Sequence, residues 1–173
     1  MTAAGVFLRR GHISAFWRVI TTMAARIDNP ANLLPDSMPG IQSIVKAAHS
    51  SGVARSTLDL VHLRASQINS CGPCVYSGAV AAKEAGESDE RLFAVAAWRE
   101  TDLFADAERA ALALAESMTR LSDRADAVPD VVWDEAARHF DDQQLAGLVL
   151  WVATTNLFNR INTAIRQPAG PLW

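Results

Sequence analysis

Apolar residues recur every three or four positions along almost the whole chain, and this spacing restricts the fold more than any other feature. It is clear in HISAFWRVITTMAARI, residues 12–27, and it returns over 41–49, 56–68 and further stretches up to residue 166. This is the period of an α-helix, and no alternating run is long enough to indicate a half-buried β-strand. The sequence therefore predicts an all-α protein.

The length and the connectors predict one domain over residues 1–173. With 173 residues, 50% of them hydrophobic, the chain is about one domain long and can bury a core without staples. The proline-rich stretch 28–40 and the polar stretch 122–130 interrupt the helices, but neither is long enough to separate two cores. We expect a single helical bundle whose C-terminal helix covers about residues 141–166.

Charge and hydropathy argue against two classes of partner. The chain has 16 basic and 19 acidic residues, and the basic ones are scattered, unlike the basic stripe of a nucleic-acid-binding protein. The longest apolar run, residues 145–153, is far shorter than the roughly 18 residues of a membrane span. Arg9, Arg10, His12 and Arg18 lie where a signal peptide would be apolar. We expect a cytoplasmic protein that binds neither nucleic acid nor membrane.

The two cysteines of the chain, Cys71 and Cys74, form the motif CGPC at the start of a predicted helix. In a reducing compartment a close pair indicates redox chemistry or metal binding. Zinc would need four ligands, and none of the four histidines has metal-ligand spacing from another Cys or His, so we expect no metal. Two thiols that act only as small hydrophobes are the structural alternative, although Gly72 and Pro73 suit the start of a helix better than its interior.

The position of the motif favours redox chemistry. If Asn69 or Ser70 caps the helix, Cys71 falls in its first turn and Cys74 lies one turn later on the same face. Free backbone N–H groups and the helix dipole would stabilise a thiolate there. The spacing lets one sulfur attack the other, which predicts a reversible disulfide. CGPC is also the thioredoxin motif, but thioredoxin places it after a strand, and none is predicted before Cys71.

A longer resemblance covers residues 58–121. The segments RASQIN, CxxC, AGE, RLFAVAAWRET and ERAALALAE resemble the AhpD-like branch of the carboxymuconolactone decarboxylase superfamily in order and spacing, and NLFNRINTAIRQPAG from residue 156 resembles its tail. The resemblance implies an all-helical fold with a redox core at about 56–121 and homo-oligomers with sites near subunit contacts. It also implies antioxidant thiol peroxidase or disulfide reductase chemistry without a cofactor. The expected partners are a small hydroperoxide or disulfide and a thiol electron donor of the lipoyl or thioredoxin type.

The resemblance also implies roles for single residues. In the family's scheme the second thiol, here Cys74, attacks the peroxide and the first, here Cys71, resolves the sulfenic acid, while a glutamate and a histidine relay a proton. Here Asp59 stands at the glutamate position and Gly78 at the histidine position. Loss of a positioned acid/base group lowers a rate by roughly 10²- to 10⁴-fold. Gly78 would leave an empty place, which either admits a bulky substrate or marks a loss of peroxidase activity.

His62 is a candidate replacement for the missing base. It follows Asp59 by three residues and precedes Ser66 by four, so the three side chains form a polar stripe on an otherwise apolar helix. Directed at Cys74, the stripe would supply a carboxylate, an imidazole and a hydroxyl to a thiolate. The alternative is a hydrogen-bonded or surface histidine without a chemical role.

Three hypotheses for function remain open. The first is a CxxC peroxidase or disulfide reductase that uses Cys74, Cys71, Asp59 and His62. The second is the decarboxylase or lactone chemistry of the superfamily, which needs no cysteine pair, and the third is an oligomeric redox-responsive binding module that has lost catalysis. Helices at 58–68 and 145–158 are apolar on more than one face, which predicts a homo-oligomer.

Overall fold

The computed structural model describes residues 24–123 and 125–170, and every regular element in these ranges is a helix, as predicted. The elements are α2 (Pro30–Leu33), α3 (Ser37–His49), α4 (Arg55–Ile68), α5 (Gly72–Glu84), α6 (Asp89–Ala94), the 3₁₀ helix η2 (Val95–Glu100), α7 (Asp106–Thr119), the 3₁₀ helix η3 (Leu121–Asp123), α8 (Asp130–Ala137) and α9 (Asp142–Ile165). No helix in the described ranges is long and apolar enough to cross a bilayer. Most of the helix expected over 12–27 lies outside the described residues, and residues 24–27 are not helical.

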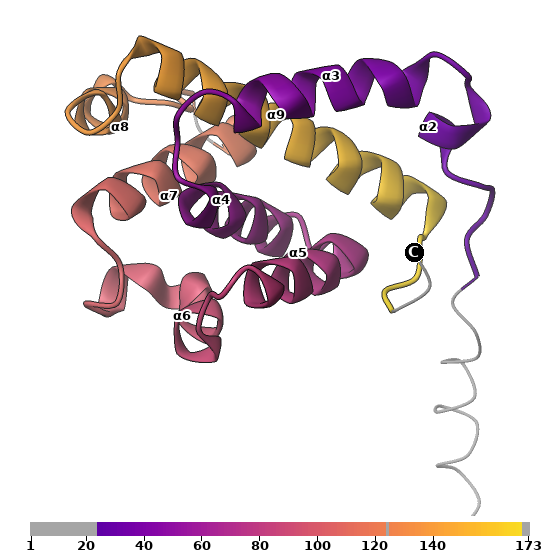
Figure 1. Ribbon diagram of the computed structural model, residues 1–173, viewed down its shortest axis with the longest axis horizontal. Helices are drawn as coiled ribbons and strands as arrows, with labels where there is room; N and C mark the ends of the chain where they lie inside the picture. Colours follow the sequence, from indigo (N-terminus) through magenta and orange to yellow (C-terminus); the bar gives the residue numbers. More distant parts are fainter. Residues whose placement is uncertain (1–23, 124, 171–173) are drawn as a thin grey trace, which may run out of the picture.

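Helix α4 lies at the centre of the bundle, in contact with α5, α7 and α9 (Figure 1). Its apolar side chains enter two separate clusters. Leu58 and Val61 join residues of α7 and α9, whereas Leu60 and Leu63 join residues of α5, η2 and α7. A helix that is apolar nearly all round can serve two clusters at once, and this explains why α4 is buried.

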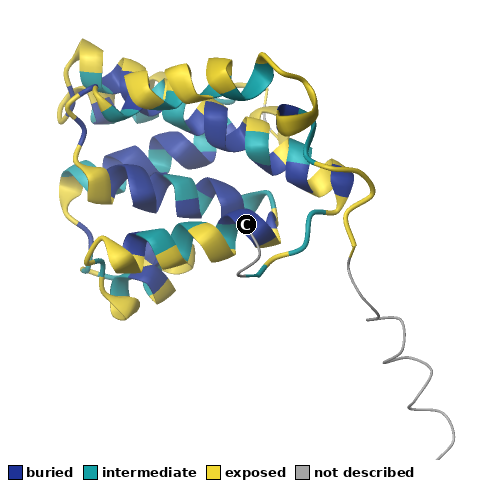
Figure 2. Cartoon of the chain, turned by 45° about the vertical axis from the view of Figure 1, so that its right-hand side comes forward, coloured by how far each residue is buried: buried dark blue, intermediate teal, exposed yellow. Residues whose placement is uncertain are grey.

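Helix α3 lies along α9 and leaves its outward face exposed (Figures 1 and 2). The α4 surfaces that led us to expect an oligomer are covered within one chain. On α9, by contrast, Leu150 and Leu157 are each 39% exposed. The homo-oligomer therefore stays a prediction, and it now depends on α9 rather than on α4.

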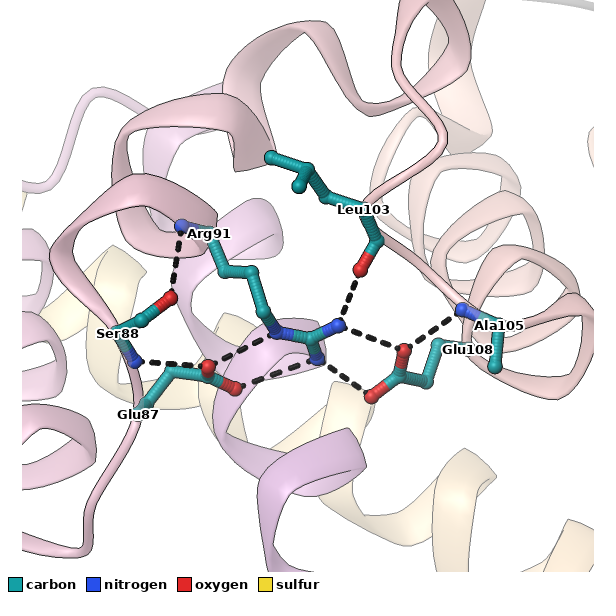
Figure 3. A network of polar contacts seen from close by, with 6 residues as sticks. All are labelled: Glu87, Ser88, Arg91, Leu103, Ala105 and Glu108. Atoms are coloured by element: carbon teal, nitrogen blue, oxygen red, sulfur yellow. Dashed lines mark hydrogen bonds and ion pairs between the residues drawn. The ribbon is translucent and has the colours of Figure 1, made fainter.

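Arg91 holds together the irregular segment between α5 and α7 (Figure 3). Its guanidinium donates to the carboxylates of Glu87 at 2.8 Å and Glu108 at 2.6 Å, and to the carbonyl of Leu103. Glu108 also accepts the backbone N–H of Ala105 at 2.9 Å, at the start of α7. One cation thus joins the residues before α6 to the first turn of α7.

Candidate active site at the start of helix α5

Cys71 and Cys74 form a disulfide at the N-terminal end of α5, with their Cα atoms 5.4 Å apart. The predicted cap was wrong: Cys71 is itself the N-cap residue, and Asn69 is the C-cap of α4. The chain turns between the two helices at Ser70, whose φ is 53°, and the Cys71 N–H donates to the Ser66 carbonyl at 3.0 Å. This short turn fixes the disulfide against the end of α4.

The disulfide is buried beside two clefts. Cys71 is 1% and Cys74 4% exposed. A cleft of about 290 Å³ is lined by Cys71, Pro73 and the end of α9, and a larger one of about 650 Å³ lies between α9 and the residues around α2. Asn162 lines both clefts, so its side chain stands between them and next to the sulfurs.

Asparagines of α9 face the disulfide and the end of α4. Asn69 Nδ2 donates to Oδ1 of Asn156 at 2.9 Å and of Asn159 at 2.8 Å, and Asn159 Nδ2 donates to Ser66 Oγ at 3.1 Å. Further along α9, Asn162 Nδ2 lies 3.3 Å from Cys74 Sγ and donates to it. From the sequence, Asn69 was expected only as a helix cap, and the asparagines of α9 were given no role, although three of them recur at a spacing of three within one helix.

His62 lies against the first turns of α5. Its Nε2 is 3.3 Å from the Cys74 carbonyl oxygen, and its Nδ1 is 3.3 Å from Thr155 Oγ1. A carbonyl can only accept, so Nε2 carries the proton and Nδ1 accepts from the hydroxyl. Burial lowers the pKa of His62, against the opposing effects of the Cys74 carbonyl and the Asp59 charge. The imidazole is therefore neutral at pH 7.

His62 also explains Gly78. A Cβ atom at position 78 would lie 2.6 Å from His62 Cδ2 and 3.0 Å from Nε2, so a side chain would fit there only if the imidazole moved away. The place that we expected to be empty is occupied by an imidazole from α4. The glycine thus makes room for a histidine of the same chain, and the idea that it admits a bulky substrate is wrong.

Asp59 lies apart from the sulfurs. Its carboxylate is almost fully buried and accepts from Arg55 Nε at 2.8 Å. It lines a third cleft, of about 310 Å³, which includes Arg91 but neither cysteine. Its link to the disulfide therefore runs through His62, on which its charge acts.

The rest of the predicted polar stripe is not directed at Cys74. Ser66 Oγ is bound by Asn159. Tyr76 is exposed, and the Ser77 hydroxyl donates to the Cys74 carbonyl at 3.5 Å. In the described ranges no group of three or more His, Cys, Asp or Glu side chains is placed to hold a metal ion. The structure therefore brings together Cys71, Cys74 and His62, with Asp59 behind the imidazole.

Comparison with known proteins shows to which family the chain belongs. The sequence pattern of the carboxymuconolactone decarboxylase family matches residues 35–117. The uncharacterised protein YdfG of Bacillus subtilis strain 168 is 32% identical over 137 residues, which are 79% of this chain and 92% of YdfG. The uncharacterised protein YnjA of Escherichia coli K12 is 38% identical over 120 residues, which are 66% of this chain and 64% of YnjA.

Two solved structures have a fold similar to that of this chain. ATU0492 of Agrobacterium tumefaciens, a protein of unknown function suggested to be the antioxidant defence protein AhpD, has a TM-score of 0.78 at 25% identity, covering 85% of this chain and 99% of its own. A variant of the debrominase Bmp8 in complex with 2,3,4-tribromopyrrole has a TM-score of 0.72 at 18% identity, covering 81% of this chain and 74% of its own, and shares the fold alone. The chain belongs to the carboxymuconolactone decarboxylase family, in its AhpD-like branch.

Proposed function

We propose that the protein is a CxxC thiol peroxidase that reduces small hydroperoxides through Cys74 and Cys71. The observation that carries the proposal is the disulfide at the start of α5, where one sulfur receives an amide N–H and a neutral imidazole lies against the same residue. A thiolate, a hydrogen-bond donor and an acid/base group are what peroxide reduction needs.

The reaction takes two electrons from the cysteine pair. The Cys74 thiolate attacks one oxygen of the hydroperoxide, so that an S–O bond forms, the O–O bond breaks and the alkoxide leaves to become an alcohol. The Cys71 thiolate then attacks the Cys74 sulfenic acid, so that the S–S bond forms, the S–O bond breaks and the leaving hydroxide takes up a proton to become water. Two thiols of an external donor reduce the disulfide and become a disulfide themselves. The cleft beside Cys71 is the expected entry for that donor.

His62 is the proposed acid/base group. As a neutral imidazole against Cys74, it can take up the proton that the Cys74 thiol releases and then give this proton to the leaving alkoxide. The Asp59 charge favours the protonated imidazole and so helps His62 to take up the proton. The family's histidine is thus replaced by one from α4 that occupies the space beside Gly78.

One observation favours a second candidate, the redox-responsive binding module. Both sulfurs are almost completely buried, which slows attack by a substrate. A module of this kind would form the disulfide without turnover. The following experiment separates the two.

The test exchanges the two positions of the imidazole. We expect His62→Ala to lower hydroperoxide turnover by roughly 10²-fold or more, and His62→Ala/Gly78→His to recover much of that loss, because the new imidazole enters the vacated space. Gly78→His alone should destabilise the fold, since the place is already filled. His49→Ala is the matched control, because both His49 and His62 pack on Trp151, at 4.6 Å and 5.8 Å between ring centroids.

Turnover is measured with a small alkyl hydroperoxide and a dithiol donor, and thiols are counted before and after one equivalent of oxidant. The wild-type protein should lose both thiols in each turnover. Disulfide formation without repeated turnover would support the binding module instead. A full rate in His62→Ala would overturn the role of His62.

A further inference from the structure

We infer that Asn162 is the donor that stabilises the Cys74 thiolate, and that Asn29, a positioning residue, fixes Asn162 in its donating orientation. The inference rests on the proposed function only in that Cys74 must become a thiolate. Neither residue stood out in the sequence, and both lie outside the matched family region 35–117.

Asn162 contacts the Cys74 sulfur directly, and both residues are buried. Asn162 Nδ2 lies 3.3 Å from Cys74 Sγ, and the two residues are 5% and 4% exposed. Burial disfavours a thiolate, because few water molecules can solvate it. An N–H group held against the sulfur replaces part of that solvation, since hydrogen bonds to a charged acceptor are stronger than neutral ones. Without Asn162 the buried thiol would hold its proton to a higher pH.

The orientation of Asn162 is fixed by a chain of hydrogen bonds that begins at a backbone group. An amide side chain can present either its oxygen or its NH₂ group to a neighbour. The Ala31 backbone N–H can only donate, and Asn29 Oδ1 accepts from it at 3.0 Å. Asn29 must therefore turn its Nδ2 towards Asn162 Oδ1, 3.4 Å away. Asn162 is left with its own Nδ2 directed at Cys74 Sγ.

If the side-chain amide of either asparagine were turned round, this sequence of donors and acceptors would be broken. Either change would set two oxygens or two NH₂ groups against each other, or remove the acceptor of the Ala31 N–H. The residues just before α2 are also bound to the end of α9. The Arg26 backbone N–H donates to Ile165 O at 2.7 Å, and its Nη1 donates to Ala164 O at 2.9 Å. These bonds help to hold Asn29 beside Asn162.

Titratable and charged groups lie near this sulfur, but the hydrogen bonds described for them go to other atoms. On α4, His62 contacts the Cys74 carbonyl, and Asp59 lies behind it. Arg166, after α9, lines the cleft beside Cys71, and Asp28 lines the larger cleft with Asn162. Among the residues that the structure describes, the side-chain hydrogen bond to Cys74 Sγ comes from a neutral amide.

The test titrates the Cys74 thiolate by its ultraviolet absorbance in the reduced full chain, in a Cys71→Ser background. We expect Asn162→Leu to raise the thiol pKa by about one unit, which lowers the thiolate fraction at neutral pH about tenfold. Asn29→Asp should raise it in the same direction. It keeps the acceptor for Ala31 but replaces the donor by an oxygen, and this turns the Asn162 oxygen towards the sulfur.

Asn32→Asp is the matched control, because it adds the same charge at an exposed position of the short helix that Asn29 caps. It should leave the thiol pKa nearly unchanged. If Asn162→Leu does not fold, Asn29→Asp decides alone. An unchanged pKa in the folded variants overturns the inference even where hydroperoxide turnover is normal. If the thiol pKa shifts but the wild-type protein does not turn over hydroperoxide, the peroxidase proposal is overturned and the inference stands.

Discussion

The two kinds of polar network in this protein differ in charge. Around α6, η2 and α7, carboxylates are paired with guanidinium groups: Glu116 accepts from Arg64 at 2.6 Å and from Arg99 at 2.5 Å, and Arg91 forms a second such cluster (Figure 3). At the disulfide, the groups that bind one another are mostly neutral amides and hydroxyls of α4 and α9. Ion pairs therefore hold the irregular half of the bundle, and amides surround the sulfurs.

The difference follows from what each region must do. Charged pairs give strong, directional ties where the backbone is irregular, and their charges cancel one another. A fixed charge beside a buried thiolate would dominate its pKa, whereas an amide stabilises it without adding a charge. The comparison predicts that a loss of charge harms the first region and that a gain of charge harms the second.

The largest effect is expected from removing the carboxylate of the ionic region. Glu116→Gln should cost about 3 kcal/mol of unfolding free energy at pH 7, because Arg64 stays buried without its partner. Urea unfolding measures the loss. Glu135→Gln, at an exposed pair, is the control and should change stability by less than about 0.5 kcal/mol. Equal losses in both variants would contradict the distinction.

The same residue predicts a pH dependence. Burial acts to raise the pKa of Glu116, but hydrogen bonds from Arg99, Trp98 and Arg64 outweigh it and hold the pKa below the ordinary value of 4.5. Its contribution to stability is therefore fully present above pH 4.5 and fades as the pH falls through the lowered value. In Glu116→Gln this acid-dependent part should be absent from the stability profile.

A smaller effect is expected from adding a charge to the amide region. Asn159→Asp should cost about 2 kcal/mol near pH 8, because the new carboxylate is buried and its remaining partners are neutral. Its pKa should be raised in the folded state, so the cost should shrink as the pH falls through that value. Asn32→Asp, which is exposed, supplies the control for a charge alone. A loss of stability that does not vary with pH would show that it comes from changed packing rather than from the added charge.

The smallest effect concerns the shape of the cation. Arg91→Lys keeps the charge but cannot serve both carboxylates and the Leu103 carbonyl at once, and we expect a loss of about 1 kcal/mol in thermal unfolding. Lys83→Met, at the exposed pair with Asp89, should have almost no effect. A neutral outcome for Arg91→Lys would mean that the fork geometry is unimportant.

Much of the fold could be predicted because its signals are local. The spacing of apolar residues indicates helices, and Gly72 and Pro73 indicate where one begins. The link between His62 and Gly78 could not be predicted, because they lie on different helices and share one space only after α4 packs on α5. The sequence shows that the family's histidine is absent at Gly78 and that a histidine is present at position 62. It does not show that the imidazole of His62 occupies the space beside Gly78.

The Asn162 contact was hidden for the same reason. It lies 88 positions from Cys74, and no local pattern links an amide to so distant a sulfur. Asn29 was less visible still, since its role depends on a backbone N–H that no sequence pattern specifies. Packing between remote segments, rather than propensity, sets the chemistry of this disulfide.

The short turn between α4 and α5 has a consequence for the time course of folding. Contacts between neighbouring helices close small loops, which cost less entropy and form sooner than contacts between remote segments. We therefore expect a nascent chain to bring its two thiols together long before α9 has been synthesised. In that interval the sulfurs can already pair with each other, while the amide that tunes them has yet to arrive.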